Sequence, residues 1–293
     1  MARTTRTVYG AELQNCMFHG IPYQILPNTT LNEKLSIRAN DFPAAGQYPT
    51  QRYMVVGNGG HFFAAGADGI PYIDDNVHRV SDAAPFRLVP LVLRLENDDL
   101  PQNLRAKYAL RRSELHHGER YYAYYARRID MTNVESKLRK ITVDNGTETV
   151  VPFVPNNSNL NPVPPVTPPN QSIPALANGD YLDVSMLITV DFTPAEVQEY
   201  INACTIIFGS DKYAAISEVG LVTGIDKLVP VDGAGGTSFQ FNEIIAAQIA
   251  THIVRYNHMA SNTDGATFTY DAGANEALLT EADEGVLGVT TLP

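Results

Sequence analysis

The chain has 293 residues, of which 44% are hydrophobic and 18% charged, so it can bury a core and is not disordered throughout. Its mean hydropathy is −0.15, and charged residues or prolines interrupt every apolar stretch, which predicts no transmembrane helix. No apolar stretch follows Met1–Arg6 to act as a signal peptide. Cys16 and Cys204 make neither a disulfide framework nor a paired-cysteine zinc site. We expect a soluble protein stabilised by packing or by assembly.

The net charge of −11 is spread unevenly along the chain. Residues 1–150 carry 18 Lys and Arg against 16 Asp and Glu (+2), whereas residues 151–293 carry 3 against 16 (−13). This asymmetry indicates two surfaces with different partners, an acidic one and a nearly neutral one with local basic density. A solvated acidic face that aids solubility would give the same distribution.

The first half of the chain is typical of antiparallel strands. Residues 51–57 predict a short strand, and a glycine-rich surface loop is expected from there to Pro71. Residues 87–95 predict another strand, in which Pro90 requires an edge, a bulge or a bend because proline cannot donate to the ladder. Residues 105–131 predict a hairpin with several tyrosines on its returning arm.

A proline-rich segment separates the two halves. Residues 140–151 predict a hairpin around Asn145–Gly146, and residues 181–191 predict a long strand. Between them, residues 152–174 contain eight prolines, which favour extended polyproline geometry. The segment is either a linker between domains or a loop that contacts a neighbouring subunit. Because strands flank it on both sides, we favour an excursion from one β-rich body over residues 1–260.

Two main helices are expected late in the chain. Thr193–Glu196 combines a hydroxyl N-cap, a proline at the first helical position and a glutamate at the third, so a helix should run to about Ile207 and stop at Gly209. Phe241–His258 is apolar around much of its circumference and predicts a buried helix. Residues 261–293 predict an extended or weakly structured tail. The fold class is mainly β (α+β), an antiparallel β-sandwich-like body with two main helices and long loops.

The most distinctive feature is a basic and aromatic stretch. Residues 105–140 carry ten basic residues against four acids, with five tyrosines among them. Such a strand face can track phosphates while tyrosines stack on unpaired bases. Alternatively, the tyrosines pack inward and the arginines form ion pairs with an acidic neighbour, for example the acidic half of the next subunit. The candidate subunit-interface or DNA-facing residues are Arg105, Lys107, Arg111, Arg112, Arg120, Arg127 and Arg128.

No motif identifies a reaction. The glycine clusters at residues 57–61 and 232–236 lack the lysine of a phosphate-binding loop and are interpreted as a structural turn and a flexible entry loop. The seven histidines do not form a His-Glu-x-x-His pattern. The adjacent carboxylates Asp74–Asp75 and Asp98–Asp99 occur in expected loops, where solvated carboxylates are the normal case. We therefore expect no catalytic residue, no metal and no cofactor.

Four segments carry a resemblance to a known class of proteins. They are RYMVVGNGGH (residues 52–61), ADGIPY (67–72), AKYALRR (106–112) and SEVGLVTG (217–224). In style they resemble virion structural proteins of large, contractile-tailed bacteriophages, most nearly a neck or head–tail connector protein, across about half of the chain. No diagnostic motif allows family residues to be carried over one by one.

The resemblance implies a β-rich, non-enzymatic subunit of a homo-oligomeric ring, made in the host cytoplasm and located in the virion. Its implied partners are portal or adaptor proteins on the head side and tail proteins on the other, with non-specific contact to genomic DNA and none to a membrane. Other virion roles, as tail terminator, tail tube or capsid decoration, stay open. A metal-assisted hydrolase that uses loop carboxylates is the alternative from another class.

Overall fold

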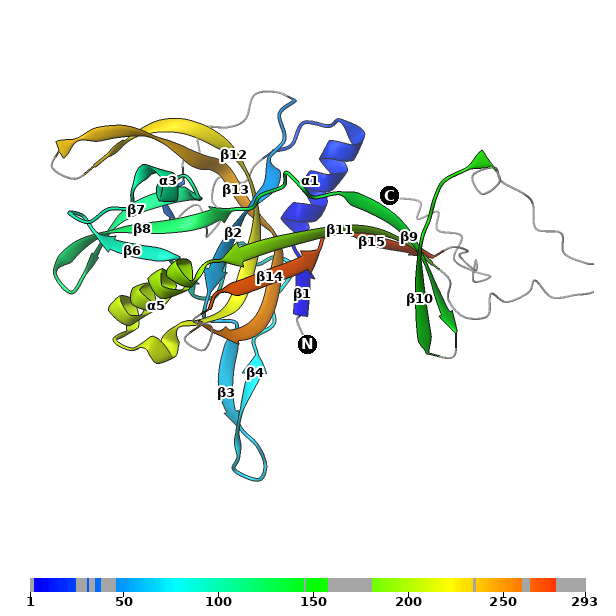
Figure 1. Ribbon diagram of the computed structural model, residues 1–293, viewed down its shortest axis with the longest axis horizontal. Coiled ribbons are helices and arrows are strands. Elements are labelled where there is room, and N and C mark those ends of the chain that lie inside the picture. The colour runs from blue at the N-terminus through cyan, green and yellow to red at the C-terminus, as the bar shows by residue number, and fades with distance from the viewer. Residues whose placement is uncertain are drawn as a thin grey trace, which may run out of the picture. The chain divides into compact units, whose positions relative to one another are not determined.

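The computed structural model describes residues 3–24, 31, 35–37, 46–144, 146–157, 181–233, 236–259 and 264–277. In this part of the chain the fold is mainly β, with antiparallel sheets and three α-helices, as the sequence predicts (Figure 1). The chain forms two compact units. Unit 1 comprises Met1–Asp130 and Val190–Thr267, and unit 2 comprises Met131–Thr189 and Phe268–Pro293.

Unit 1 is built on an eight-stranded sheet with the order β1-β13-β12-β2-β8-β6, in which β5 pairs with β2 and β7 pairs with β8. Although β7 and β13 lie far apart in this order, they contact each other, so the sheet curls over its own inner face. The strands are β1 (Arg3–Arg6), β2 (Thr50–Gly57), β5 (Leu88–Val89), β6 (Val92–Leu95), β7 (Tyr108–His116), β8 (Glu119–Arg128), β12 (Ala215–Asp232) and β13 (Ser238–His258).

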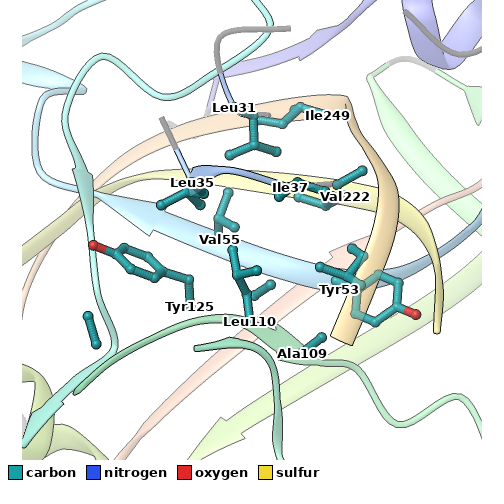
Figure 2. Packing of buried hydrophobic residues seen from close by; sticks show 14 of the residues in the cluster. Leu31, Leu35, Ile37, Tyr53, Val55, Ala109, Leu110, Tyr125, Val222 and Ile249 are labelled. Carbon is teal, nitrogen blue, oxygen red and sulfur yellow. The ribbon is translucent and has the colours of Figure 1, made fainter. Parts of the chain in front are cut away.

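The core of unit 1 lies inside this curl. Leu110 of β7, Val222 of β12 and Ile249 of β13 belong to one buried cluster (Figure 2). Ala123 of β8 belongs to the same cluster and is also completely buried. Tyr53 of β2 lies in the same cluster. Residues more than a hundred positions apart in the sequence therefore share one core, which fixes β7 and β8 firmly in place.

The predicted helix over Phe241–His258 is wrong, because this segment is the long strand β13. It pairs with β12 on one side and with β1 on the other, and residues in its middle are buried on both faces of the sheet. A run of apolar residues that is buried on both faces does not show the two-residue alternation of a half-exposed strand. The left-handed Ala246, with φ of 56°, and several register shifts against β12 also disturb the pattern.

The helix predicted from Thr193 is confirmed as α5 (Pro194–Phe208). The Thr193 side chain accepts a hydrogen bond from the Glu196 main chain, the Glu196 side chain reaches back to Thr193, and Gly209 ends the helix in a left-handed conformation. The other helices are α3 (Gln102–Arg105), the short 3-10 helix η1 (Asp211–Tyr213) and α1 (Val8–His19).

The sequence did not predict α1, in which Leu13 is the buried residue. The helix lies on β13, where a Cβ at Gly10 would stand 2.7 Å from the carbonyl oxygen of Ala250. Only glycine permits this approach, so α1 is held by a close main-chain contact rather than by a wide apolar stripe.

The glycine-rich segment up to Pro71 is not simply a loop. It contains strand β3 (His61–Ala65), which forms a two-stranded hairpin with the following strand β4 (Pro71–Asp75), and this hairpin projects from the rest of unit 1 (Figure 1). Two strands without a packed face are marginally stable by themselves in water. This hairpin contacts β13, and its large apolar side chains are exposed.

Unit 2 is organised around a five-stranded sheet with the order β10-β9-β11-β14, in which β15 pairs with β11. The predicted hairpin over residues 140–151 and the strand over 181–191 are confirmed. The strands are β9 (Ser136–Asp144), β10 (Thr147–Pro152), β11 (Tyr181–Phe192), β14 (Ala266–Asp271) and β15 (Ala274–Ala277). Part of the predicted C-terminal tail is thus strand. Residues 158–180, with most of the proline-rich segment, and residues 278–293 lie outside the described part.

Candidate functional site

The seven predicted basic residues lie in one region of unit 1, on α3, β7, β8 and the turn between α3 and β7 that contains Lys107. Arg111 is the most deeply placed of them, with a side chain that is 5% exposed. Its guanidinium pairs with Asp99 at 2.9 Å, donates to the Asp232 carbonyl at 2.8 Å and lies 3.4 Å above the ring centroid of Tyr122. Arg105 also pairs with Asp99, at 3.4 Å, and stacks over Phe239. These contacts hold the β12–β13 connection against β7.

A second acidic residue, Glu196 at the start of α5, pairs with two of the cations. Lys107 lies 3.1 Å and Arg127 3.3 Å from the same carboxylate oxygen. Burial by itself would raise the pKa of Glu196, but the Thr193 main-chain hydrogen bond and the two cations hold that pKa below its ordinary value. Glu196 therefore serves the helix cap and the ion pairs as a carboxylate.

The remaining three cations also have acidic partners in the same chain. Arg112 pairs with Glu243 at 2.5 Å and donates to the carbonyl oxygens of Leu35 and Ser36, and Arg128 pairs with Asp226 at 2.6 Å. The ion pair of Arg120 with Glu96 is the weakest of these, because the Arg120 side chain is 63% exposed and the two charged groups are 3.8 Å apart. Glu196, Asp226 and Glu243 all belong to the acidic half of the sequence.

Four of the five tyrosines of the stretch point inward. Tyr108, Tyr122, Tyr124 and Tyr125 are buried, and three of their hydroxyls donate to the carboxylates of Glu96, Asp99 and Glu114. Burial, followed by these carboxylates, raises the pKa of Tyr124 and of Tyr125. Their rings are not available to stack on bases. Of the two interpretations from the sequence, the structure favours inward packing with ion pairs, formed within one chain.

The glycine cluster at residues 57–61 surrounds a carboxylate of the same chain, that of Glu218. The buried Glu218 of β12 accepts main-chain hydrogen bonds from Gly59, Phe86 and Arg87, each 2.8 to 2.9 Å long. A Cβ at Gly57 would stand 2.4 Å from the Glu218 carboxylate. The cluster is therefore a structural turn, as predicted, and its glycines are required because Glu218 approaches them so closely.

Sequence reasoning missed the histidines that surround Glu218. His78 Nε2 lies 3.1 Å from Glu218 Oε2, and His78 Nδ1 lies 3.1 Å from Asp82 Oδ2. The His78 ring stacks between Phe86 and His252. The signal was a glutamate inside the apolar run of residues 215–222. The side chains of Glu218 and His78 are fully buried. This cluster therefore connects β12 to two loops and is not an accessible site.

Burial and the neighbouring ionisable groups shift the pKa values in this cluster. Burial, followed by the proximity of His78, lowers the pKa of His252 to about 4. Burial by itself would raise the pKa of Glu218, but His78 and the three main-chain donors hold it below its ordinary value. At neutral pH the cluster therefore contains a carboxylate at Glu218 and an uncharged His252.

The carboxylates of the hydrolase alternative do not converge, and Asp74 and Asp75 lie in strand β4 rather than in the loop that the sequence predicted. Asp99 is held by Arg105, Arg111 and Tyr124, Asp98 pairs with Arg94, and Asp75 pairs with Arg3. Asp74 accepts from the main chain of Asp75. Among the described residues, no group of three or more His, Cys, Asp or Glu side chains is arranged to hold a metal ion. These carboxylates have structural partners.

One face of the unit 2 sheet carries aliphatic side chains that the described residues of the unit leave exposed or half-buried. The strand registers place Leu138, Leu182, Val184 and Val151 on one face of the sheet, around Lys140, which stands opposite both Leu182 and Val151. All four are partly or largely exposed. Among the described residues of unit 2, the buried aliphatic side chains are Ile141 and Ile188. We call the face with Leu138, Val151, Leu182 and Val184 the open face.

The molecule is thus a mainly β protein of two units, in which unit 1 pairs its charges internally and unit 2 keeps an apolar face open. Residues 1–285 match a family described as a family of unknown function, DUF7208, and the chain belongs to that family. No curated protein matches the chain. No solved structure matches it either. In the part that the structure describes, none of the helices has the length and apolarity needed to cross a membrane.

Proposed function

We propose that this chain is a non-enzymatic virion structural protein that forms an oligomeric ring at the neck of a tailed phage, joining the head to the tail around the DNA passage. The observation that carries the proposal is the open face of unit 2. An antiparallel sheet is stable when at least one of its faces is packed. A sheet whose described residues bury only two aliphatic side chains is suited to being completed by another subunit.

A neighbouring copy is the simplest cover for the open face. In a closed ring each subunit offers one patch to the next subunit and receives a different patch on its other side, so one open face per chain is the expected pattern. The apolar side chains supply the free energy of association, at roughly 25 cal/mol per Å² of apolar area removed from water. The resemblance of residues 52–61, 67–72, 106–112 and 217–224 to virion proteins supports a place in the particle.

The charges support a passage for DNA rather than a binding site for it. All seven candidate cations have acidic partners in the same chain, and the net charge is −11. Strong non-specific DNA binding requires cations that are free to neutralise phosphates. A wall with paired cations and a net negative charge would let DNA slide past without holding it. The basic strands then serve the fold of the subunit, and contact with genomic DNA is weak.

The test is the mass of the purified protein over a range of salt, measured by native mass spectrometry, followed by electron microscopy of any ring. Val151→Asp and Val150→Asp make a matched pair, because the two valines are neighbours in β10, are 44% and 50% exposed, and point to opposite faces of the sheet. We expect Val151→Asp to dissociate the oligomer and Val150→Asp to leave it intact.

Two results would contradict the proposal. A compact monomer at every concentration and salt, with no closure when virion partners are added, would remove the ring. Equal effects of Val151→Asp and Val150→Asp would show that the open face is not the contact. The diameter and symmetry of a ring would separate the neck from a tail tube, a tail terminator or a capsid decoration.

A further inference from the structure

The hairpin formed by β3 and β4 has one protected and one unprotected edge. In an antiparallel pair, successive residues direct their main-chain N–H and C=O groups alternately toward the partner strand and away from it. The hydrogen bonds from Asn76 to Gly60 and from Gly66 to Ile70 fix this alternation. Phe62 and Ala64 therefore face β4, and His61, Phe63 and Ala65 direct their main-chain groups away from it.

The β4 edge is blocked. Its outward positions are Pro71, Ile73 and Asp75. Pro71 has no N–H, and the N–H of Asp75 donates to the side chain of Asp74 at 2.8 Å. A contact between two β4 strands would also place Asp74 and Asp75 of each copy, four aspartates in all, in one sheet. Proline and charge are the features by which sheet edges are protected from pairing with other chains.

The β3 edge has none of these protections. Its sequence, His61-Phe62-Phe63-Ala64-Ala65, contains no proline, lysine, arginine or carboxylate. Phe63 is 70% exposed, and in the described part of the chain β3 pairs with β4 alone. An uncharged and aromatic edge on a projecting hairpin is a template for one more strand.

We propose that the added strand is β3 of a second copy of this chain, antiparallel and related by a two-fold axis at Phe63. In this register Phe63 faces Phe63 of the other copy, and His61 faces Ala65. The residues that exchange hydrogen bonds between the two copies are then His61, Phe63 and Ala65, whose main-chain groups point away from β4. The edge is therefore complementary to itself. The like-charge repulsion that would oppose a β4 contact is absent here.

The pairing also covers apolar surface. Phe63 and Ile73 are cross-strand partners on one face of the hairpin. In the four-stranded sheet they form a continuous row, Ile73 and Phe63 of one copy followed by Phe63 and Ile73 of the other. Aromatic pairs of this kind stabilise antiparallel strands. Because the contact uses the same patch on both copies, it is distinct from the head-to-tail contact of a ring.

Ala65→Pro tests the β3 edge with little change elsewhere, because the N–H of Ala65, which the substitution removes, points away from β4. The matched control is Ala65→Ser, which keeps the N–H. We expect Ala65→Pro to weaken the two-fold dimer by about tenfold to a hundredfold, since a lost hydrogen bond costs on the order of tenfold and the axis repeats the loss. The measurement is the mass by light scattering against concentration, with circular dichroism to verify the fold. If Ala65→Pro fails to fold, Phe63→Lys, which places two cations across the axis, decides the question.

A disulfide trap tests the register. In a Cys16→Ser background, Phe63→Cys should cross-link to itself, because the Cα atoms of a hydrogen-bonded pair are about 5.5 Å apart, within disulfide range. Tyr72→Cys on β4 is the exposed control, and it should cross-link far more slowly because three strand spacings of about 4.8 Å would separate the two copies.

Three results would overturn the inference: a mass that Ala65→Pro and Ala65→Ser affect equally, a monomer at every concentration, or cross-linking at residue 72 as fast as at residue 63. A failure of the proposed ring can be told apart from a failure of the β3 contact. If only the ring is wrong, the largest species is a dimer, and Ala65→Pro dissociates it. If only the β3 contact is wrong, the ring has the same mass in Ala65→Pro as in the unchanged protein.

Discussion

The two units differ in how far they bury their own apolar side chains and pair their own charged ones. Unit 1 buries a continuous core, including Leu110 and Ile249, and pairs its strand arginines with carboxylates of the same chain. Among its described residues, unit 2 buries the aliphatic side chains of Ile141 and Ile188 and leaves an apolar face open. The difference indicates that the buried core lies in unit 1, and it makes unit 2 the place where the proposed ring contact would form.

The largest expected effect comes from removing a buried charge in unit 1. Arg111→Ala leaves the carboxylate of Asp99, whose side chain is 10% exposed, with the longer ion pair to Arg105 and the hydrogen bond from Tyr124. Breaking a buried pair in this way costs about 3 to 5 kcal/mol. Urea unfolding followed by circular dichroism measures the change.

The matched control for this prediction is Arg120→Ala on the neighbouring strand, where the arginine side chain is 63% exposed. After screening by solvent, the loss there should be below about 1 kcal/mol. Equal losses in the two variants would show that the internal ion pairs do not stabilise unit 1.

The next effect compares the apolar residues of the two units directly. Leu110→Ala empties part of the core of unit 1, since Leu110 is fully buried, and should cost about 3 kcal/mol. Leu138→Ala on the open face should change the stability of the isolated subunit by less than about 0.5 kcal/mol, because Leu138 is 43% exposed. It should weaken the oligomer instead. A large loss of subunit stability in Leu138→Ala would mean that unit 2 has a core of its own.

The pH dependence should also separate the units. The pKa of His252 is lowered to about 4 in the folded chain, so between pH 6.5 and pH 4 the unfolded state binds a proton that the folded state does not. Stability therefore falls as the pH drops through this window, by up to about 3 kcal/mol. His252→Gln should flatten the curve of unfolding free energy between these pH values.

Unit 2 contains no histidine and should not respond in that window. Burial by itself would raise the pKa of its Asp271, but hydrogen bonds from Ser185 and Met186 hold that pKa below its ordinary value. The stability that Asp271 contributes is then lost only below about pH 4. A steep loss that persists in His252→Gln between pH 6.5 and pH 4 would contradict this assignment.

The sequence predicted those elements whose signals are local. The cap at Thr193–Glu196 located α5, and the turn at Asn145–Gly146 located the β9–β10 hairpin. It failed where the partner is distant in the chain. The apolar run 241–258 becomes strand because β12 and β1 flank it, although its many β-branched residues, such as Ile244, Ile249 and Val254, did favour a strand.

The same distinction applies to the candidate site. The basic residues of 105–128 were located from composition, and ion pairing was foreseen as one of two interpretations. Which acids pair with them was not, because Glu196, Asp226 and Glu243 lie many residues away. Glu218 was missed for the same reason, since its partners at Gly59 and His78 reach it only through the fold.

The smallest effect tests whether the units are energetically independent. Thr193 follows the point at which the chain returns from unit 2 to unit 1, and it caps α5 through Glu196. Thr193→Ala should cost about 1 kcal/mol, whereas Thr193→Ser keeps the hydroxyl and should cost little. Because Glu196 also pairs with Lys107 and Arg127, this loss falls on unit 1. The midpoint of urea unfolding of Thr193→Ala should therefore decrease while the mass of the oligomer stays unchanged. If the oligomer of Thr193→Ala instead dissociates while its urea midpoint is unchanged, the two units are coupled.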